Sequence, residues 1–373
     1  MSATTYSLSR FIRLGLVALT IISSAVQVIA AQNNNTSTPF EGLRLTGQWF
    51  LAYEVDRAGD DDLNEFKLKR GYVSVHKKFT DQLTARITQD ISVDQEGDGR
   101  GDVELRLKYG YLRYRLPNLS LVFKPTLEFG LAHRPWLDFE QKMTGIRVQG
   151  TMFLERYNVL KSADYGIMFS ALLGGEIGQH YKRRVSGAYP GRYGSIAVGV
   201  YNGGGYSAIE ENENKLLEGR LTVRPLPSIL PGVQMSLLGG YGKGNTVESP
   251  DLNYLTAFFS VQHSRFLATV QYYTGEGDVD GTAIDSTGHA LQRDGYSVFG
   301  RVMTSFENLG VFGRYDHFDT NTDRADTDLT RFIVGLSVPI YKKSKIIVDH
   351  DYLESDLAAH IERVWEVAVE INY

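Results

Sequence analysis

The sequence of 373 residues contains no cysteine and only 10 prolines. The lack of cysteine excludes a disulfide framework and any metal site built from thiolates. Positive charge is not in excess either, because 39 lysines and arginines face 44 aspartates and glutamates, for a net charge of -5. This balance offers no surface for nucleic acid. After residue 30 no apolar run is long enough for a transmembrane helix, so a membrane-embedded form of the chain has to be a β-barrel.

Residues 1–30 differ in composition from the rest of the chain. Arg10 and Arg13 precede the apolar stretch "LGLVALTIISSAV", and "VIAA" supplies small residues for cleavage. This order is typical of a secretory signal peptide. The apolar stretch is short for a membrane span and is interrupted by serine and glutamine, so an anchor is the weaker interpretation. We expect residues 1–30 to be a signal peptide and residues 31–373 to form an exported protein.

The remainder of the chain alternates polar and apolar residues in sixteen segments. In the first, Leu43, Leu45 and Leu51 share one face of an extended strand, because successive side chains of a strand point to opposite faces. The alternation is weaker in 65–79 and 254–263. The segments are 42–55, 65–79, 82–94, 103–116, 119–132, 164–177, 191–202, 215–225, 232–242, 254–263, 265–274, 295–306, 309–318, 329–340, 345–353 and 361–373.

The connections between these segments fall into two groups. Odd-numbered ones are mostly long and polar, such as "DRAGDDDLN" and "DTNTDRADTD", whereas even-numbered ones are mostly short, such as "TD" and "EN". The sequence thus predicts an all-β fold, a 16-stranded antiparallel transmembrane β-barrel with short periplasmic turns and long external loops. A soluble β-sandwich would not explain the asymmetry. The stretch "GQHYKRRVSGAYP" breaks the rule, so either its flanking strands are longer or the strand count is wrong there.

The last eleven residues, "RVWEVAVEINY", show the alternation most clearly. Trp365, Val367 and Tyr373 fall on one face, and Glu366 and Glu370 on the other. In a barrel the apolar face contacts lipid and the polar face borders the water-filled interior. We therefore expect Glu366 and Glu370 to line the pore, and the two aromatic residues to lie near opposite ends of the strand, where aromatic girdles sit.

The expected signal peptide, the sixteen-strand layout and the terminal "VWEVAVEINY" resemble those of Gram-negative porins. Several segments are similar to the phosphate-selective porin O and P family: "FKLKRGYVSVHKKF", "LTARITQDISVD", "IAVGVYNGGG", "EGRLTVRPLP" and "VFGRYDHFD". The resemblance implies a homotrimer in the outer membrane, surrounded by its lipid. It also implies that the barrel-insertion machinery reads the aromatic end of the last strand. The third long loop, residues 133–163, would fold into the channel as a constriction.

With apolar side chains outward, the first four strands direct a row of basic side chains into the barrel, with fewer acids, Glu54, Asp90 and Glu104. Polar residues line any water-facing barrel wall, so a single one carries little information. Together they form a wall of net positive charge. The predicted pore-lining bases are Arg44, Lys67, Lys69, Arg86, Arg106 and Lys108.

The long segment 133–163 contains Asp138 and Glu140. If it folds inward, these carboxylates face the basic wall and create a transverse field across a narrow, water-filled gap. From the residues alone, an external loop with solvated charges is the alternative. With the resemblance in view, we expect Asp138 and Glu140 to line the pore.

These features predict a passive channel for small hydrophilic solutes and ions. Glu366 and Glu370 weigh against anion selectivity, so we expect a general diffusion pore, with an anion- or phosphate-selective porin as the alternative. A barrel adhesin or a barrel enzyme is weaker, since no serine stands convincingly with a histidine as nucleophile and base. We expect no cofactor and no metal site, because the oxygen-rich stretch 94–102 has Leu105 where an EF-hand needs its glutamate.

Overall fold

The computed structural model describes residues 40–58, 61–95, 99–306, 309–357 and 360–373. The expected signal peptide, residues 1–30, lies outside the described residues. Residues 43–373 form one compact unit. Among the helices of the described ranges, none is long and apolar enough to cross a membrane.

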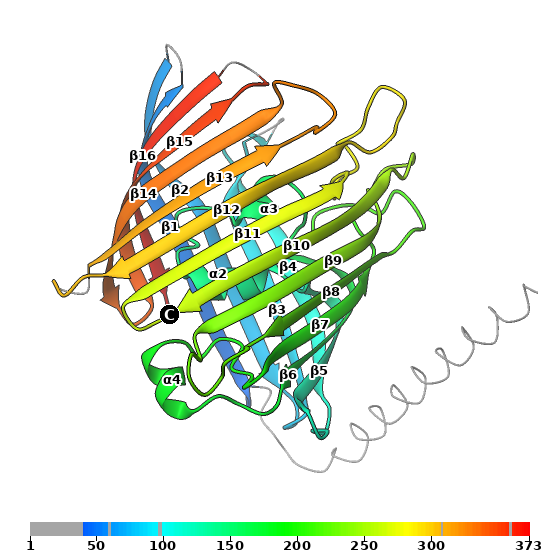
Figure 1. Ribbon diagram of the computed structural model, residues 1–373, viewed down its shortest axis with the longest axis vertical. Helices are drawn as coiled ribbons and strands as arrows, with labels where there is room; N and C mark the ends of the chain where they lie inside the picture. Colours follow the sequence, from blue (N-terminus) through cyan, green and yellow to red (C-terminus); the bar gives the residue numbers. More distant parts are fainter. Residues whose placement is uncertain (1–39, 59–60, 96–98, 307–308, 358–359) are drawn as a thin grey trace, which may run out of the picture. The chain divides into compact units, whose positions relative to one another are not determined.

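Antiparallel strands pair in sequence order and close into a barrel through β1 and β16 (Figure 1). At this seam Gln48 lies opposite Asn372, and Glu54 lies opposite Glu366. Closure pairs the backbone groups that two open edges would leave free. The predicted 16-stranded antiparallel barrel is confirmed. Its strands are β1 (Leu43–Ala58), β2 (Asp61–Lys78), β3 (Leu83–Val93), β4 (Val103–Arg115), β5 (Val122–His133), β6 (Ala163–Leu173), β7 (Gly194–Tyr201), β8 (Leu216–Val223), β9 (Val233–Lys243), β10 (Asp251–Gln262), β11 (Phe266–Glu276), β12 (Gln292–Met303), β13 (Gly310–Asp319), β14 (Asp328–Tyr341), β15 (Ser344–Ser355) and β16 (His360–Asn372).

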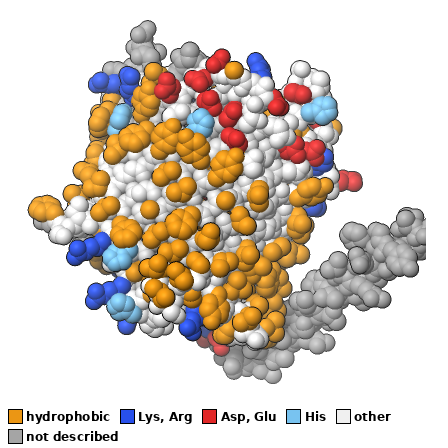
Figure 2. Space-filling model, in the orientation of Figure 1, with side chains coloured by type: hydrophobic (Ala, Val, Ile, Leu, Met, Phe, Trp, Pro, Cys, Tyr) orange, Lys and Arg blue, Asp and Glu red, His pale blue; other side chains and the backbone are white. Residues whose placement is uncertain are grey.

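The outer surface of the barrel is mainly apolar. On β16, Trp365 and Val367 are exposed on this surface, whereas Glu366 and Ala368 are buried on the inner side. Figure 2 shows hydrophobic side chains spread over the strands and acidic ones gathered at the upper rim. The two-residue period of the terminal segment therefore separates an apolar outer face from a polar inner one.

The connections differ in length between the two ends of the barrel, which we name the long-loop end and the short-turn end. At the long-loop end, the connections after β3, β5, β7 and β11 span 94–102, 134–162, 202–215 and 277–291. At the short-turn end, those after β2, β10 and β14 span only 79–82, 263–265 and 342–343. This arrangement agrees with the asymmetry expected from the sequence.

Two connections differ from the expectation. The stretch "DRAGDDDLN" belongs largely to strands, because β1 extends to Ala58 and β2 begins at Asp61. At the short-turn end, the connection between β6 and β7 is long, residues 174–193, and contains helix α4 (Gln179–Arg184). Both flanking strands are shorter than predicted and the count of sixteen is right. Neither explanation offered for the exceptional stretch therefore holds, and it is an insertion with its own structure.

The aromatic residue that follows β16 covers a glycine of β1. Gly47 and Tyr373 exchange two backbone hydrogen bonds of 3.1 Å each. A Cβ atom on Gly47 would lie 2.1 Å from the Tyr373 ring. The ring thus occupies the space of the missing side chain, directly at the seam that closes the barrel.

We predict that Gly47→Val lowers the heat stability of the folded barrel. The added side chain has to displace the Tyr373 ring, which is 58% exposed, so the cost is about 1 kcal/mol, the lower end of what overpacking costs in a core. The measurement is the temperature at which the folded band converts to the unfolded band on an SDS gel. Gly300→Val is the matched control, because nothing lies within 4 Å of a Cβ atom there. Equal conversion temperatures for the two variants would contradict the prediction.

Candidate functional site

Residues 134–162, which we name the inner loop, fold into the barrel (Figure 1). The loop carries helices α2 (Leu137–Thr144) and α3 (Phe153–Arg156). Trp136 and Phe139 are fully buried and pack against Phe258 of β10, with ring centroids 5.3 and 6.0 Å away. This contact explains the weak alternation of segment 254–263. The outer face of β10 is apolar, and its inner face carries Leu252, Tyr254 and Phe258 among polar residues because it packs against the loop.

The second half of the inner loop packs on the opposite part of the wall. Ile146 and Val148 join a buried cluster with Phe50 of β1 and Phe312 of β13. Basic side chains of the wall hold the loop backbone as well; the Lys69 ammonium, for example, donates to the Gln149 carbonyl at 2.9 Å. The loop therefore packs mainly against β8–β16 and the adjoining part of β1, and the remaining space lies mainly beside β1–β8 and the end of β16.

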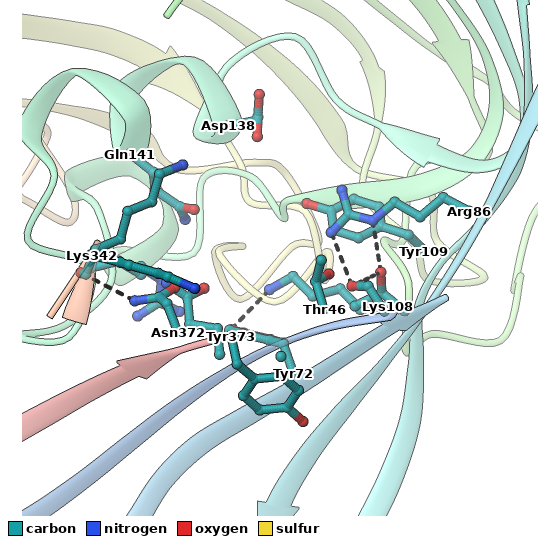
Figure 3. A pocket seen from close by; sticks show the side chains of 16 residues that line it. Thr46, Tyr72, Arg86, Lys108, Tyr109, Asp138, Gln141, Lys342, Asn372 and Tyr373 are labelled. Atoms are coloured by element: carbon teal, nitrogen blue, oxygen red, sulfur yellow. Dashed lines mark hydrogen bonds between the residues drawn. The ribbon is translucent and has the colours of Figure 1, made fainter. Parts of the chain in front are cut away.

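Two cavities occupy this space. The smaller, of about 430 Å³, lies between Arg86, Lys108 and Tyr109 on the wall and Asp138 and Gln141 on α2 (Figure 3). The larger, of about 1230 Å³, extends to residues of the short-turn end. Positive charge dominates both linings. Their basic residues are Arg44, Arg86, Lys108, Arg113, Lys124, Arg134, Lys142, Arg147, Arg220, Lys342, Lys343 and Lys345, and their acidic residues are Glu128, Asp138 and Glu370.

Arg86 and Lys108 are held in place without a carboxylate. The Arg86 Nε donates to the Thr88 hydroxyl at 2.8 Å, and its guanidinium lies 4.6 Å from the Tyr109 ring centroid. The Lys108 ammonium donates to the Tyr72 hydroxyl at 3.1 Å. Within the described part of the chain, neither base has an acid within 4.0 Å. Their charge is thus available to solutes in the smaller cavity, whereas the predicted base Arg44 lines the larger one.

The other three predicted bases are neutralised. Lys67 pairs with Glu54, Lys69 pairs with Glu366, and Arg106 lies 3.8 Å from the Asp90 carboxylate. None of these three residues lines either cavity. The basic wall expected from the sequence is therefore split into a paired part and an unpaired part. Which of its residues line a conducting pore stays a prediction.

The predicted acids of the last strand are also paired. Glu366 contacts Lys69, as above, and Glu370 lies 3.3 Å from the Lys345 ammonium. Both carboxylates are 5% exposed. Glu370 still lines the larger cavity, whereas Glu366 lines neither. Because each has a basic partner, their presence no longer counts against a preference for anions.

Asp138, in contrast, faces the space between loop and wall. Its carboxylate accepts hydrogen bonds from the Lys142 ammonium at 2.6 Å and from the Tyr189 hydroxyl at 2.5 Å. Burial by itself would raise the pKa of Asp138, but the charges of Lys142 and His133 and these hydrogen bonds hold it below the usual value. Asp138 is therefore ionised, and its charge is largely balanced by its own neighbour on α2.

Two β-bulges change which side chains face the interior, so the alternation in the sequence did not predict every pore-facing residue. The β1–β2 register shifts between Phe50 and Leu51, and the β3–β4 register shifts between Thr88 and Gln89. A bulge adds one residue, so every side chain beyond it changes face. Arg113 consequently lines the larger cavity, where its guanidinium pairs with Glu128. The blurred alternation of 65–79 was the sequence signal of the first bulge.

Glu140 lies on the far side of α2 from the basic wall. It is 3% exposed, lines neither cavity, and accepts a hydrogen bond from the Trp136 indole at 2.8 Å. Burial raises its pKa from 4.5 to about 7, although the charge of Arg314 and the indole hydrogen bond oppose this. The transverse field expected from two loop carboxylates thus has a contribution from Asp138 alone, because 3.6 residues per turn place Glu140 on another face.

The raised pKa of Glu140 predicts a pH-dependent packing of the inner loop. A carboxyl whose folded pKa is raised stabilises the packing fully below pH 4.5, and this contribution is lost as pH rises through about 7. In a Trp49→Phe/Trp365→Phe background, fluorescence reports on Trp136 alone. We expect a fluorescence change with a midpoint near pH 7 that is absent after Glu140→Gln. A midpoint that survives the substitution would assign the change to another group.

The described residues contain no group of three or more histidines, aspartates or glutamates that could hold a metal ion. The cavities have more basic than acidic residues in their linings, and the smaller one also has the hydroxyl groups of Tyr72, Tyr109 and Ser74 near Arg86. Such a lining can attract and orient small polar or anionic solutes.

Solved structures of other proteins share the fold of this chain. No protein-family model and no curated protein matches the sequence. Among solved structures, a loop L8 deletion mutant of OmpT, an outer membrane protein of Vibrio cholerae, is 13% identical, with 89% of this chain and 100% of that chain covered and a TM-score of 0.57. In-vitro folded OmpT in its trimer form is 13% identical, with coverages of 89% and 100% and a TM-score of 0.52. The anion-selective porin from Comamonas acidovorans is 10% identical, with coverages of 89% and 99% and a TM-score of 0.53. At such identities, the likeness establishes that the chain has the fold of outer-membrane barrel proteins.

Proposed function

We propose that the chain forms a water-filled channel in the outer membrane of a Gram-negative bacterium, through which small hydrophilic solutes and ions diffuse passively. The observation that carries the proposal is a closed barrel with an apolar exterior and an interior that retains polar cavities of about 430 and 1230 Å³. An apolar outer surface suits contact with lipid. A polar interior with room left between its side chains suits occupation by water and solutes.

The proposal also includes an orientation and an assembly for this channel. The short-turn end faces the periplasm and the long-loop end faces outward, as is usual for such barrels. Residues 1–30 act as the signal peptide, and the barrel-insertion machinery reads the last strand with its terminal Tyr373. The inner loop acts as the constriction. The chain is a homotrimer, a proposal that the resemblance to porins supports, as does the trimer form of OmpT from Vibrio cholerae.

A preference for anions is the second candidate, and the charge of the cavity linings favours it. Arg86 and Lys108 have no carboxylate partner among the described residues, whereas Asp138 is balanced by Lys142. The acids that argued for a general diffusion pore are neutralised by Lys69 and Lys345. Cations that project into a narrow passage without partners raise the local concentration of anions.

The channel itself is tested by conductance. Purified folded protein added to a planar lipid bilayer in KCl should produce uniform, ohmic current steps, because a water-filled passage conducts in proportion to the applied voltage. Heat-denatured protein at the same detergent concentration is the control. If folded protein inserts into the bilayer without current steps, the channel proposal is wrong, and a barrel that binds a partner through its loops becomes the better interpretation.

Ion preference is tested by the reversal potential in a KCl gradient. Removing one charge from a water-filled passage changes the interaction with an ion by about 1 kcal/mol at 4 Å, and the change has opposite signs for chloride and potassium. Arg86→Ala should therefore lower the chloride-to-potassium permeability ratio by up to about 30-fold. Arg106→Ala is the matched control, because Arg106 is close to Asp90 and lines neither cavity. An equal effect of both substitutions would refute the role of the unpaired bases. Replacing chloride by phosphate then separates general anion preference from phosphate selectivity.

A further inference from the structure

The long connection at the short-turn end, residues 174–193, enters the barrel; we name it the short-turn insertion. It first continues β6 and β7, with the Ile177 amide donating to the Pro190 carbonyl at 2.8 Å. Helix α4 then lies at the mouth of the barrel (Figure 1). The segment after α4 reaches inward, where residues 186–190 line the larger cavity. The inner loop and the short-turn insertion therefore meet inside the barrel, having entered from opposite ends.

Tyr189 is the point of contact between the two. Its hydroxyl donates to the Asp138 carboxylate at 2.5 Å, and its ring packs edge-on against Phe139 of α2 with centroids 5.1 Å apart. The guanidinium of Arg220, from β8, lies 4.2 Å from the Phe139 centroid and 5.0 Å from the Tyr189 centroid. Helix α2 is thus supported on the side of the short-turn end by a hydrogen bond, a ring contact and a shared cation.

The barrel wall holds the short-turn insertion through several hydrogen bonds and a cation–π contact. Arg224, in the turn after β8, donates from Nε to the Gly191 carbonyl at 3.0 Å and from Nη2 to the Tyr189 carbonyl at 3.4 Å. Its guanidinium also lies 5.4 Å from the ring centroid of Tyr181. Tyr181 in turn donates to the Gln262 side chain at 3.3 Å. The support under α2 is therefore itself anchored on β8 and β10.

Tyr189 has an unusual backbone conformation, and its hydroxyl has a raised pKa. Its φ is +42°, a left-handed conformation that a bulky residue rarely adopts unless its surroundings impose it. Burial, together with the negative charge of Asp138, raises the pKa of Tyr189 well above the usual value. The hydroxyl therefore keeps the proton that it donates, and the contact with Asp138 persists across the working pH range.

We propose that Tyr189 is a positioning residue of the channel, which supports α2 from the short-turn end and keeps the Asp138 carboxylate away from the basic wall. No ion pair joins Asp138 to Arg86 or Lys108 in the described ranges, since its carboxylate is held by Lys142 and Tyr189. The width and the charge of the passage are then set jointly by two segments from opposite ends of the barrel. The inference rests on the proposed channel function.

The test compares three variants with the wild type in planar bilayers. Tyr189→Phe keeps the ring and removes the hydrogen bond, so Asp138 can turn toward the bases and the reversal potential should shift toward potassium. Tyr189→Ala also removes the support of α2 and should increase the single-channel conductance. Tyr193→Phe is the matched control, because Tyr193 belongs to the same insertion but is exposed and lines neither cavity; this variant should behave as the wild type.

A double-mutant cycle separates positioning from a merely structural role. If Tyr189 acts through Asp138, Tyr189→Phe should have no effect on the reversal potential in an Asp138→Ala background. A shift of the same size in that background would overturn the positioning role. So would wild-type conductance and reversal potential in both Tyr189 variants.

A second readout does not depend on current. In the background that retains only Trp136, Tyr189→Ala should alter the tryptophan fluorescence, because Trp136 packs on Phe139 at 5.5 Å and senses any displacement of α2. If the wild type inserts but does not conduct, the channel function fails, and this fluorescence change still shows whether Tyr189 supports α2. Unchanged fluorescence in Tyr189→Ala would overturn that support.

Discussion

The closed ladder of backbone hydrogen bonds constrains every other feature of the molecule. Once β1 pairs with β16, each strand has to direct its side chains alternately outward and inward. An apolar outside and a polar inside satisfy this constraint over most of the wall. The inner loop changes the requirement where it packs, because Phe258 and Phe312 face inward to bury it. Inward-facing apolar side chains therefore mark the parts of the wall against which the loop packs.

The charge that a solute would meet depends less on the number of inward-facing charged side chains than on which of them form ion pairs. Inward-facing acids and bases occur together on the seam strands, but Glu366 and Glu370 are each matched by a lysine, and such buried charges are costly unless they are paired. Toward the short-turn end, Arg86 and Lys108 instead donate hydrogen bonds to hydroxyl groups, and Arg86 also contacts an aromatic ring. A wall of mixed composition can thus present charge of one sign to the passage.

The sequence predicted the strand number, the closed barrel and the two faces of the terminal strand, because a period of two residues is a local property. It did not predict the inward faces of Arg113 and Arg70, because Arg113 lies beyond a bulge and Arg70 lies next to one, and no characteristic residue type marks a bulge. Glu140 was expected beside Asp138, yet their separation on a helix places them on different faces. The contact of Tyr189 with α2 joins segments far apart in the chain, and no local pattern encodes it.

The bulges in β2 and β4 have an evolutionary consequence. Where a strand carries an extra residue, neighbours such as Lys108 and Tyr109 both reach the inner side. A single insertion or deletion at such a point exchanges the inner and outer sets of side chains from there to the end of the strand, without any substitution. Related barrels could thereby change the charge of their passage in one step. Pore residues should therefore be transferred between such proteins only after the bulges, and not merely the strands, have been superimposed.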